Sequence, residues 1–260
     1  MKTVFFTWIT NDFKNTIIDF DGFYKSFKYF HPDVDLVVFD DVDIKNLYAE
    51  KPWLYSDNCK GSFAKLLYND YDLVVNIDSD FYFFDRLHEI LAGDYDVAAS
   101  ANFNVACNTK MIPREINGYN LPFVHEINYI QAGLVASPNK EFWDEYETAS
   151  KDLARLLPLR DNDVLNMIWY SGKYKTKILD GAFDFRNPEF KRYYNCASLG
   201  REQFAQLRDN KVYLDDKQVA SYHVAFGNNG AAGVPKRRMN QIFNPEICQW
   251  FNDIIGTVHE

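Results

Sequence analysis

The chain has 260 residues, 47% hydrophobic and 25% charged, which is typical of one folded domain with a sizeable core and excludes a disordered chain. Its net charge of −9 argues against a broad surface for nucleic acid or anionic membranes, although Lys236-Arg237-Arg238 could bind one phosphate group. The cysteines are widely separated, and neither a long apolar run nor a basic signal region is visible, so we expect buried thiols in a cytoplasmic protein.

The first half of the chain alternates short apolar runs with segments of helical periodicity. The apolar runs are rich in β-branched and aromatic residues and end in polar turns, as buried strands do. The expected strands are Thr3–Trp8, Asp35–Phe39, Leu73–Ile77 and residues 96–99. Helices are expected at residues 16–30, 62–68 and 86–91. This order of strand, helix and strand predicts an α/β protein with a doubly wound sheet.

The second half is less regular. Residues 101–122 show no clear period and are expected to form a long loop beside an active site or an acceptor. The expected strands are residues 129–136, 176–179, 211–213 and 219–224, and the expected helices are residues 140–157, 164–170 and 241–260. A loop rich in Gly and Asn, residues 227–233, precedes the basic cluster. Without an internal repeat or a low-complexity linker, residues 1–260 are predicted to form a single domain.

An acid pair follows the most apolar strand. Leu73–Ile77 contains no polar alternation and ends directly in Asp78-Ser79-Asp80. In an open α/β sheet the carboxyl ends of the strands face the ligand crevice, so both carboxylates are expected there. Two carboxylates so close together repel each other, and a hard divalent cation with oxygen ligands relieves this repulsion. Acid pairs are also common in solvated turns, but the buried strand and the aromatic residues 81–84 favour a metal site.

The order of these features resembles the GT-A nucleotide-sugar glycosyltransferases, in particular the glycogenin and bacterial lipooligosaccharide galactosyltransferase family (glycosyltransferase family 8-like). The landmarks extend from Thr7 to about Lys236. They are Thr10-Asn11-Asp12, Lys65, Asp78-Ser79-Asp80, Gln131-Ala132-Gly133, Asp161-Asn162-Asp163-x-Leu165-Asn166, and His223 with Gly227. The chain departs from the family in three places: Gln131 replaces an Asn, Asn162 replaces a Gln, and the Lys-Pro-Trp motif after the His/Gly pair is absent.

The resemblance implies a GT-A (Rossmann-like) fold with a mostly parallel central sheet flanked by helices. It also implies a metal-dependent transfer of a hexose, glucose or galactose, from a UDP-sugar. Residues 1–100 would form the nucleotide-binding half, 101–240 the acceptor and donor-sugar half, and 241–260 a C-terminal helix. Asp80 would bind Mn²⁺ or Mg²⁺ directly, while Asp78 would share the metal and contact the ribose. His223 would be the third metal ligand, although a histidine in a strand is more often a packed residue.

The remaining site residues also follow from the resemblance. Trp8, Thr10 and Asn11 would line the base pocket, although Asn11 and Asp12 could simply cap a helix. Other residues expected at the nucleotide or the sugar are Lys65, Gly227, Gln131, Asp161 and Asn162. Lys65 could equally be a solvated helix lysine, and Asp161 an ordinary N-cap. An amide at Asn162 rather than a carboxylate favours transfer with retention of configuration, unless Asp161 or Asp163 acts as a base.

Two other functional classes remain compatible with the sequence. A haloacid-dehalogenase-type phosphatase also uses a D-x-D motif, but it requires Thr or Val two positions later, where this chain has Tyr82. A non-catalytic nucleotide-sugar or carbohydrate-binding protein would need the base pocket without the metal ligands. The acceptor, which could be a glycan, a lipid or a protein, and the oligomeric state are not encoded in any motif, and the net charge makes nucleic acid an unfavourable acceptor.

Overall fold

The computed structural model describes residues 1–11, 19–54, 59–91, 93–101, 115–120, 129–157, 160–179, 185–186, 205–214, 217–223 and 243–258. These residues divide into two compact units. Unit 1 comprises Met1–Trp8, Asp35–Ile77 and Glu89–Leu179, and unit 2 comprises Ile9–Val34, Asp78–His88 and Asp180–Glu260. Several expected features lie outside the described residues: Asp12, Cys107, Cys196, Gly227, the rest of the 227–233 loop and the basic cluster 236–238.

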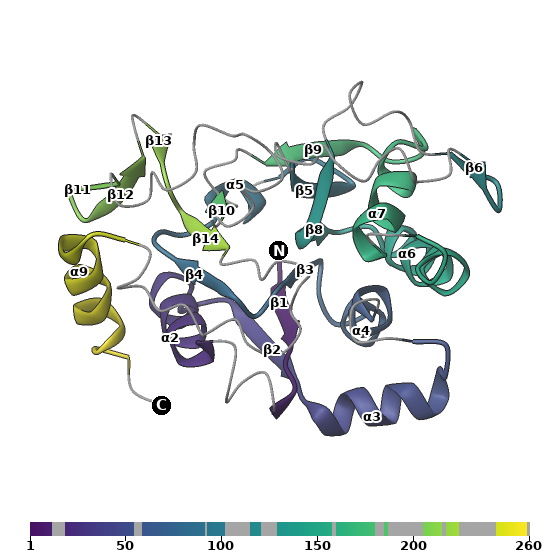
Figure 1. Cartoon of the computed structure of the whole chain (residues 1–260), viewed down its shortest axis with the longest axis horizontal. Helices are drawn as coiled ribbons and strands as arrows, with labels where there is room; N and C mark the ends of the chain where they lie inside the picture. Colours follow the sequence, from purple (N-terminus) through teal and green to yellow (C-terminus); the bar gives the residue numbers. More distant parts are fainter. Residues whose placement is uncertain are drawn as a thin grey trace. The chain divides into compact units, whose positions relative to one another are not determined.

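A six-stranded sheet forms the centre of unit 1 (Figure 1), in the order β2-β1-β3-β8-β5-β9. The strands are β1 (Thr3–Trp8), β2 (Asp35–Phe39), β3 (Leu73–Ile77), β5 (Val97–Ala101), β8 (Ile130–Ser137) and β9 (Thr176–Leu179). Only β8 runs antiparallel to its neighbours, so the sheet is mostly parallel. Every residue of β3 is buried, as its continuous apolar run predicts.

Helices of unit 1 pack aromatic and small residues against this sheet. They are α3 (Asp41–Glu50), α4 (Lys60–Leu67), α6 (Lys140–Leu153) and α7 (Asp161–Trp169). Trp143 of α6 meets Phe6 of β1 edge to face, with ring centroids 6.2 Å apart. Helices α4 and α6 approach so closely that a Cβ on Gly61 would lie 2.6 Å from the backbone nitrogen of Glu147. Glycine is therefore required at this crossing.

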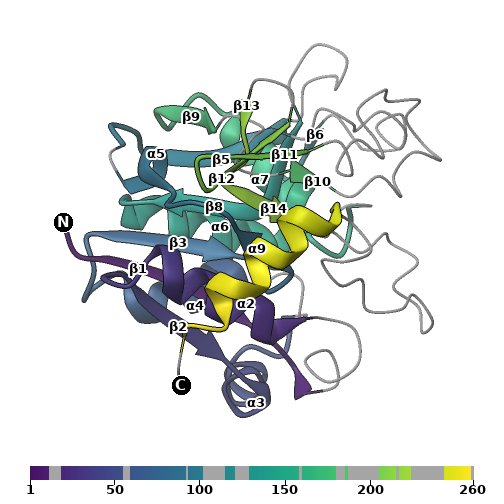
Figure 2. The same cartoon turned by 90° about the vertical axis from the view of Figure 1, so that its left-hand side faces the viewer.

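Unit 2 contains short strands covered by two amphipathic helices. Strand β14 (Ser221–His223) lies between β10 (Phe185–Arg186) and β4 (Phe81–Phe83), and it is antiparallel to β4. Helices α2 (Phe20–Phe30) and α9 (Pro245–Ile255) lie side by side (Figure 2), and Phe30 contacts Trp250. Unit 2 also contains a sheet of β11 (Gln206–Arg208), β12 (Lys211–Leu214) and β13 (Lys217–Gln218). The β6 and β7 hairpin (Glu115–Ile116, Tyr119–Asn120) belongs to unit 1, and α5 (His88–Leu91) begins at the last residue of a unit 2 segment and continues into unit 1.

The predicted α/β class, with a mostly parallel central sheet flanked by helices, is confirmed. Four strands have the predicted bounds: β1, β2, β3 and β9. Helix α3 was not predicted, because its hydrophobic periodicity is weak. Its start was nevertheless detectable, since Asp40 and Asp43 form a reciprocal capping box. Cys59 and Cys248 are both buried. None of the described helices has the length and hydropathy needed to cross a membrane.

Candidate metal and sugar site

The acid pair lies in a turn between two strands. Strand β3 ends at Ile77 and β4 begins at Phe81, so Asp78 and Asp80 occupy the connection. In the antiparallel pairing of β14 with β4, His223 is opposite Phe81. This register brings a residue from near the end of the chain next to the acid pair. The His223 ring stacks on Phe81, with centroids 4.3 Å apart and an interplanar angle of 15°.

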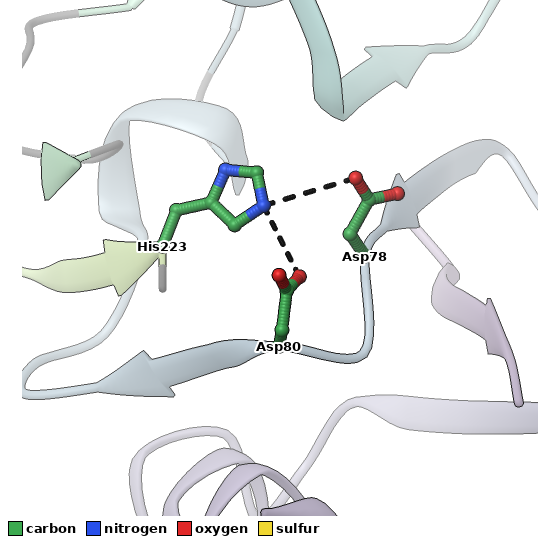
Figure 3. A group of neighbouring side chains, drawn as sticks. All are labelled: Asp78, Asp80 and His223. Carbon is green, nitrogen blue, oxygen red and sulfur yellow. Dashed lines mark ion pairs between the residues drawn. The ribbon is translucent and has the colours of Figure 1, made fainter. Parts of the chain in front are cut away.

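The three side chains converge on one point (Figure 3). The Nε2 atom of His223 lies 3.1 Å from Oδ1 of Asp80 and 3.8 Å from Oδ2 of Asp78. One ligand atom from each residue can be chosen so that all three lie within 4.8 Å of one another. His223 is 2% exposed, whereas both aspartates remain partly accessible. These three residues were the predicted metal ligands, and the fold brings them together.

This set of donor atoms fits a divalent cation. Two carboxylates and one imidazole nitrogen supply the oxygen and nitrogen ligands that Mn²⁺ accepts. Without a cation, a protonated His223 would instead form an ion pair with the two acids. Both arrangements relieve the repulsion between Asp78 and Asp80, and only a metal-binding measurement separates them.

A second group of polar residues lies in unit 1, at the start of α7. Asp161 begins the helix, and its Oδ2 atom lies 2.9 Å from Nζ of Lys60. Lys60 is 3% exposed and also donates to the carbonyl of Ala132 at 2.5 Å. Asn162 donates to Oδ1 of Asp161 from its amide group at 3.2 Å, and its Oδ1 accepts from the backbone N–H of Ala132 at 3.0 Å. The first turn of α7 is therefore tied to β8.

The residue before α7 has a strained backbone. Arg160 has φ of 44° and ψ of −112°, in the left-handed half of conformational space that disfavours residues with a side chain. Such strain persists only where surrounding contacts over-determine the conformation, and it is common at functional sites. The hydroxyl of Tyr146, which donates to the carbonyl of Asp161 at 3.1 Å, is one of these contacts.

Asp163 and Asn166 lie deeper in the same helix. Asp163 is completely buried and accepts from the hydroxyl of Tyr129 at 2.5 Å. Burial raises the pKa of this tyrosine well above its usual value, and the neighbouring Asp163 raises it further. The phenol of Tyr129 therefore stays protonated and donates its hydrogen bond to Asp163.

Lys65 lies between two acidic side chains of α6. The ammonium of Lys65 lies 2.8 Å from a carboxylate oxygen of Asp144 and 2.8 Å from one of Glu147, both on α6. The hydrogen bonds that the Lys65 ammonium donates to these two carboxylates raise its pKa above the usual value. In these contacts Lys65 links α4 to α6, and Lys60, five residues earlier, is the lysine that reaches Asp161. Lys60 was not predicted as a site residue, because a lysine at a helix start has no pattern that predicts burial.

The expected base-binding residues lie near the end of β1. Trp8 is partly buried, its ring is 6.3 Å from the ring of Phe63, and Nζ of Lys60 lies 5.4 Å from its centroid. Thr10 is partly buried and Asn11 is exposed, and both belong to unit 2. Gln131, in β8, is 8% exposed, and its Oε1 atom has no hydrogen-bond partner within the described structure.

Comparison with solved structures finds this fold among glycosyltransferases. The chain aligns over 99% of its length with the WbbM bifunctional glycosyltransferase (TM-score 0.57, 14% identity), and spans only 50% of that protein's chain. It aligns over 99% of its length with 96% of the galactosyltransferase LgtC, solved in complex with donor and acceptor sugar analogues (TM-score 0.52, 14% identity). It also aligns over 98% of its length with 63% of the glycosyltransferase GlyE of Streptococcus pneumoniae TIGR4 (TM-score 0.53, 13% identity).

No protein-family model matches the chain, and a search of curated proteins finds no match either. The likeness to solved structures therefore rests on the course of the backbone, at sequence identities of 13% to 14%. The predicted resemblance is confirmed at that level: the chain has the GT-A glycosyltransferase fold.

Proposed function

We propose that this protein is a metal-dependent glycosyltransferase that moves a hexose, glucose or galactose, from a UDP-sugar to an acceptor. The convergence of Asp78, Asp80 and His223 on one point carries the proposal. A fold shared with solved glycosyltransferases supports it. Neither observation identifies the acceptor.

The metal ligands would be the two carboxylates and the imidazole. Asp80, whose Oδ1 lies 3.1 Å from His223, would bind Mn²⁺ or Mg²⁺ directly, and Asp78 would share the cation and contact the ribose. A bound cation supplies electrostatic stabilisation to the negative charge that develops on a leaving diphosphate. His223 is stacked on Phe81, and this packing would keep Nε2 aimed at the acids with little loss of side-chain entropy on binding.

The nucleotide and sugar would contact residues from several elements. Trp8, Thr10 and Asn11 would meet the base, with Gly227 at the diphosphate. The carboxylate of Asp161, held by Lys60, would accept hydrogen bonds from sugar hydroxyls, and the buried Oε1 of Gln131 would accept another. A buried acceptor without a partner costs about 1 to 3 kcal/mol, and a sugar hydroxyl would remove that cost.

The contacts of the acids in α7 support the proposal of retention of configuration. An inverting enzyme needs a carboxylate base that can take a proton from the acceptor hydroxyl. Asp163 is completely buried and accepts a hydrogen bond from the hydroxyl of Tyr129, and Asp161 forms an ion pair with Lys60. We therefore assign the amide groups of Asn162 and Gln131, rather than a carboxylate, to the position beside the reacting carbon. An amide cannot act as the base that inversion requires, so this assignment favours a retaining reaction.

Calorimetric titration with UDP tests the nucleotide and metal parts of the proposal. UDP should bind much more tightly with Mn²⁺ than without it, and Asp80→Asn should abolish the difference. Incubation with a panel of UDP-sugars, followed by mass detection of released sugar, then identifies the donor. Tight UDP binding without any turnover would favour a non-catalytic nucleotide-sugar-binding protein, and equal UDP affinity with and without metal would contradict the metal site.

A further inference from the structure

Strand β8 contains a break in its pairing with β5. The adjacent β5 residues Ala99 and Ser100 pair with Val135 and Gln131, which are four positions apart. The intervening β8 residues, Ala132 to Leu134, therefore have no partner on β5. Bulges of this kind bend a strand and re-aim the side chain next to them, and they are over-represented beside active sites.

Side chains from α7 and α4 form hydrogen bonds with backbone groups of β8 at this break. The amide group of Asn166 accepts from the N–H of Ile130 at 2.8 Å and donates to the carbonyl of Ile130 at 2.8 Å. One helical turn earlier, Asn162 accepts from the N–H of Ala132 at 3.0 Å, and Lys60 donates to the carbonyl of Ala132. Both residues that flank Gln131 are thus held through their N–H and their C=O.

Asn166 is central to this arrangement. Its Nδ2 atom also donates to the carbonyl of Asn162 at 2.7 Å, so one amide group connects Ile130 in β8 to Asn162 in α7. Asn166 is completely buried, which removes competing water from these bonds. Gln131 lies between Ile130 and Ala132, and its own buried Oε1 atom has no hydrogen-bond partner within the described structure.

We propose that Asn166 is a positioning residue that aims the side-chain amide of Gln131 at the donor sugar. The inference rests on the proposed function, because it assigns Gln131 a contact with the sugar. Asn166 itself is buried in the helix and acts only through the backbone of Ile130 and through Asn162. Asn166 bonds both backbone groups of Ile130 and the carbonyl of Asn162, and the side chain of Asn162 in turn accepts from the N–H of Ala132. These bonds fix the residues on both sides of Gln131, whose Oε1 atom lacks a partner in the described structure.

The test combines single and double variants in the donor-hydrolysis or transfer assay. Asn166→Ala should lower kcat by about 100-fold, the loss expected for a displacement of about 1 Å, with little change in KM for the donor. Asn166→Ser serves as a milder replacement if the alanine variant does not fold. The decisive measurement is made in the Gln131→Ala background, where adding Asn166→Ala should lower kcat by a clearly smaller factor than it does in the wild type, because the contribution that passes through Gln131 is already gone.

Met167→Ala is the matched control. Met167 is buried in the same helix, one residue further on, and its thioether side chain has no hydrogen-bond donor, so the alanine variant loses apolar packing and leaves the amide of Asn166 in place. It should lower the melting temperature and leave kcat unchanged at temperatures where the variant is folded. Equal additional losses of kcat in the wild-type and Gln131→Ala backgrounds would overturn the inference alone. A wild-type protein that neither hydrolyses nor transfers any UDP-sugar would overturn the proposed function and this inference together.

Discussion

The Nζ atom of Lys60 lies 2.9 Å from Oδ2 of Asp161, and the two side chains are only 4% and 12% exposed. Lys60→Met should destabilise the protein by about 3 to 5 kcal/mol, because it leaves a buried carboxylate without its counter-charge. Lys60→Met combined with Asp161→Asn should cost much less than the sum of the two single changes. Urea unfolding of the four proteins gives this coupling energy, and strictly additive losses would contradict a direct ion pair.

Binding of Mn²⁺ should stabilise the folded protein through Asp78, Asp80 and His223. A ligand at about 100 times its Kd adds about 2.7 kcal/mol to the free energy of unfolding. Thermal unfolding should therefore show a higher Tm with Mn²⁺ in the wild type and no shift in Asp80→Asn. Asp21→Asn, on the exposed side of α2, is the control and should keep the wild-type shift.

The His223 assignment requires a separate measurement. His223→Ala should weaken Mn²⁺ affinity more than it weakens UDP affinity measured without metal, because the imidazole contributes a metal ligand and not a nucleotide contact. Titration calorimetry with each ligand in turn gives both affinities. Equal losses would mean that His223 packs the site or touches the nucleotide, and its role as a ligand would be withdrawn.

Two buried asparagines should respond in opposite ways to the same substitution. Asn76 in β3 is completely buried, and neither atom of its amide group has a partner in the described structure, whereas Asn166 is equally buried and fully engaged. Asn76→Leu should raise the free energy of unfolding by about 1 to 3 kcal/mol, and Asn166→Leu should lower it by at least as much. Chemical denaturation measures both. Destabilisation by Asn76→Leu would indicate that its amide binds something essential to the fold.

Stability should fall between neutral pH and pH 4 through His31. Burial lowers the pKa of His31 from 6.5 to about 4, and Nε2 accepts from the backbone N–H of Leu87 at 3.0 Å. As the pH falls, His31 is protonated near pH 6.5 in the unfolded chain but only near pH 4 in the folded chain. Protonation therefore favours the unfolded chain, and stability is lost as the pH falls through this window. The loss is on the order of 3 kcal/mol.

The pH dependence can be assigned to this residue by comparison with a variant. Arg86, Asp33 and Asp85 also affect the His31 ring electrostatically. The hydrogen bond between Arg86 and Asp33 lowers the pKa of Asp33 to about 2 and raises the pKa of Arg86, so this pair stays charged across the window. Urea unfolding of the wild type and of His31→Leu between pH 7.5 and 4.5 should show a steeper loss in the wild type. Parallel curves would show that another group titrates.

The transferred sugar should keep its anomeric configuration, giving an α-linked product from an α-linked donor. The acids of α7 are engaged by Lys60 and Tyr129, which leaves amides near the sugar in the proposed site. Proton NMR of the first-formed product reports the configuration. For a transferred glucose or galactose, a large axial-axial coupling at the anomeric proton would mark a β linkage and contradict retention.

Local patterns were sufficient for much of the fold. The apolar runs of β1 and β3 specify strands because β-branched, aliphatic and aromatic residues suit a strand buried on both faces. The bounds of β2 and β9 were also predicted, although these two strands are more exposed. The short, acidic α3 was missed, since its residues provide little amphipathic periodicity. The same local patterns predicted that Asp78 and Asp80 follow the end of a buried strand, where the side chains of an α/β sheet face the ligand crevice.

The sequence by itself determined the residue types of the site and the strand that carries the acids. Only the tertiary structure decided which distant groups meet them. His223 reaches Asp80 because β14 pairs with β4 in one register, and a shift of one residue would turn the imidazole to the opposite face. Lys60, rather than Lys65, reaches Asp161 because α4 crosses α6 closely at Gly61 and engages Lys65 with the acids of α6. Such pairings depend on packing between segments far apart in the chain, and no local pattern encodes them.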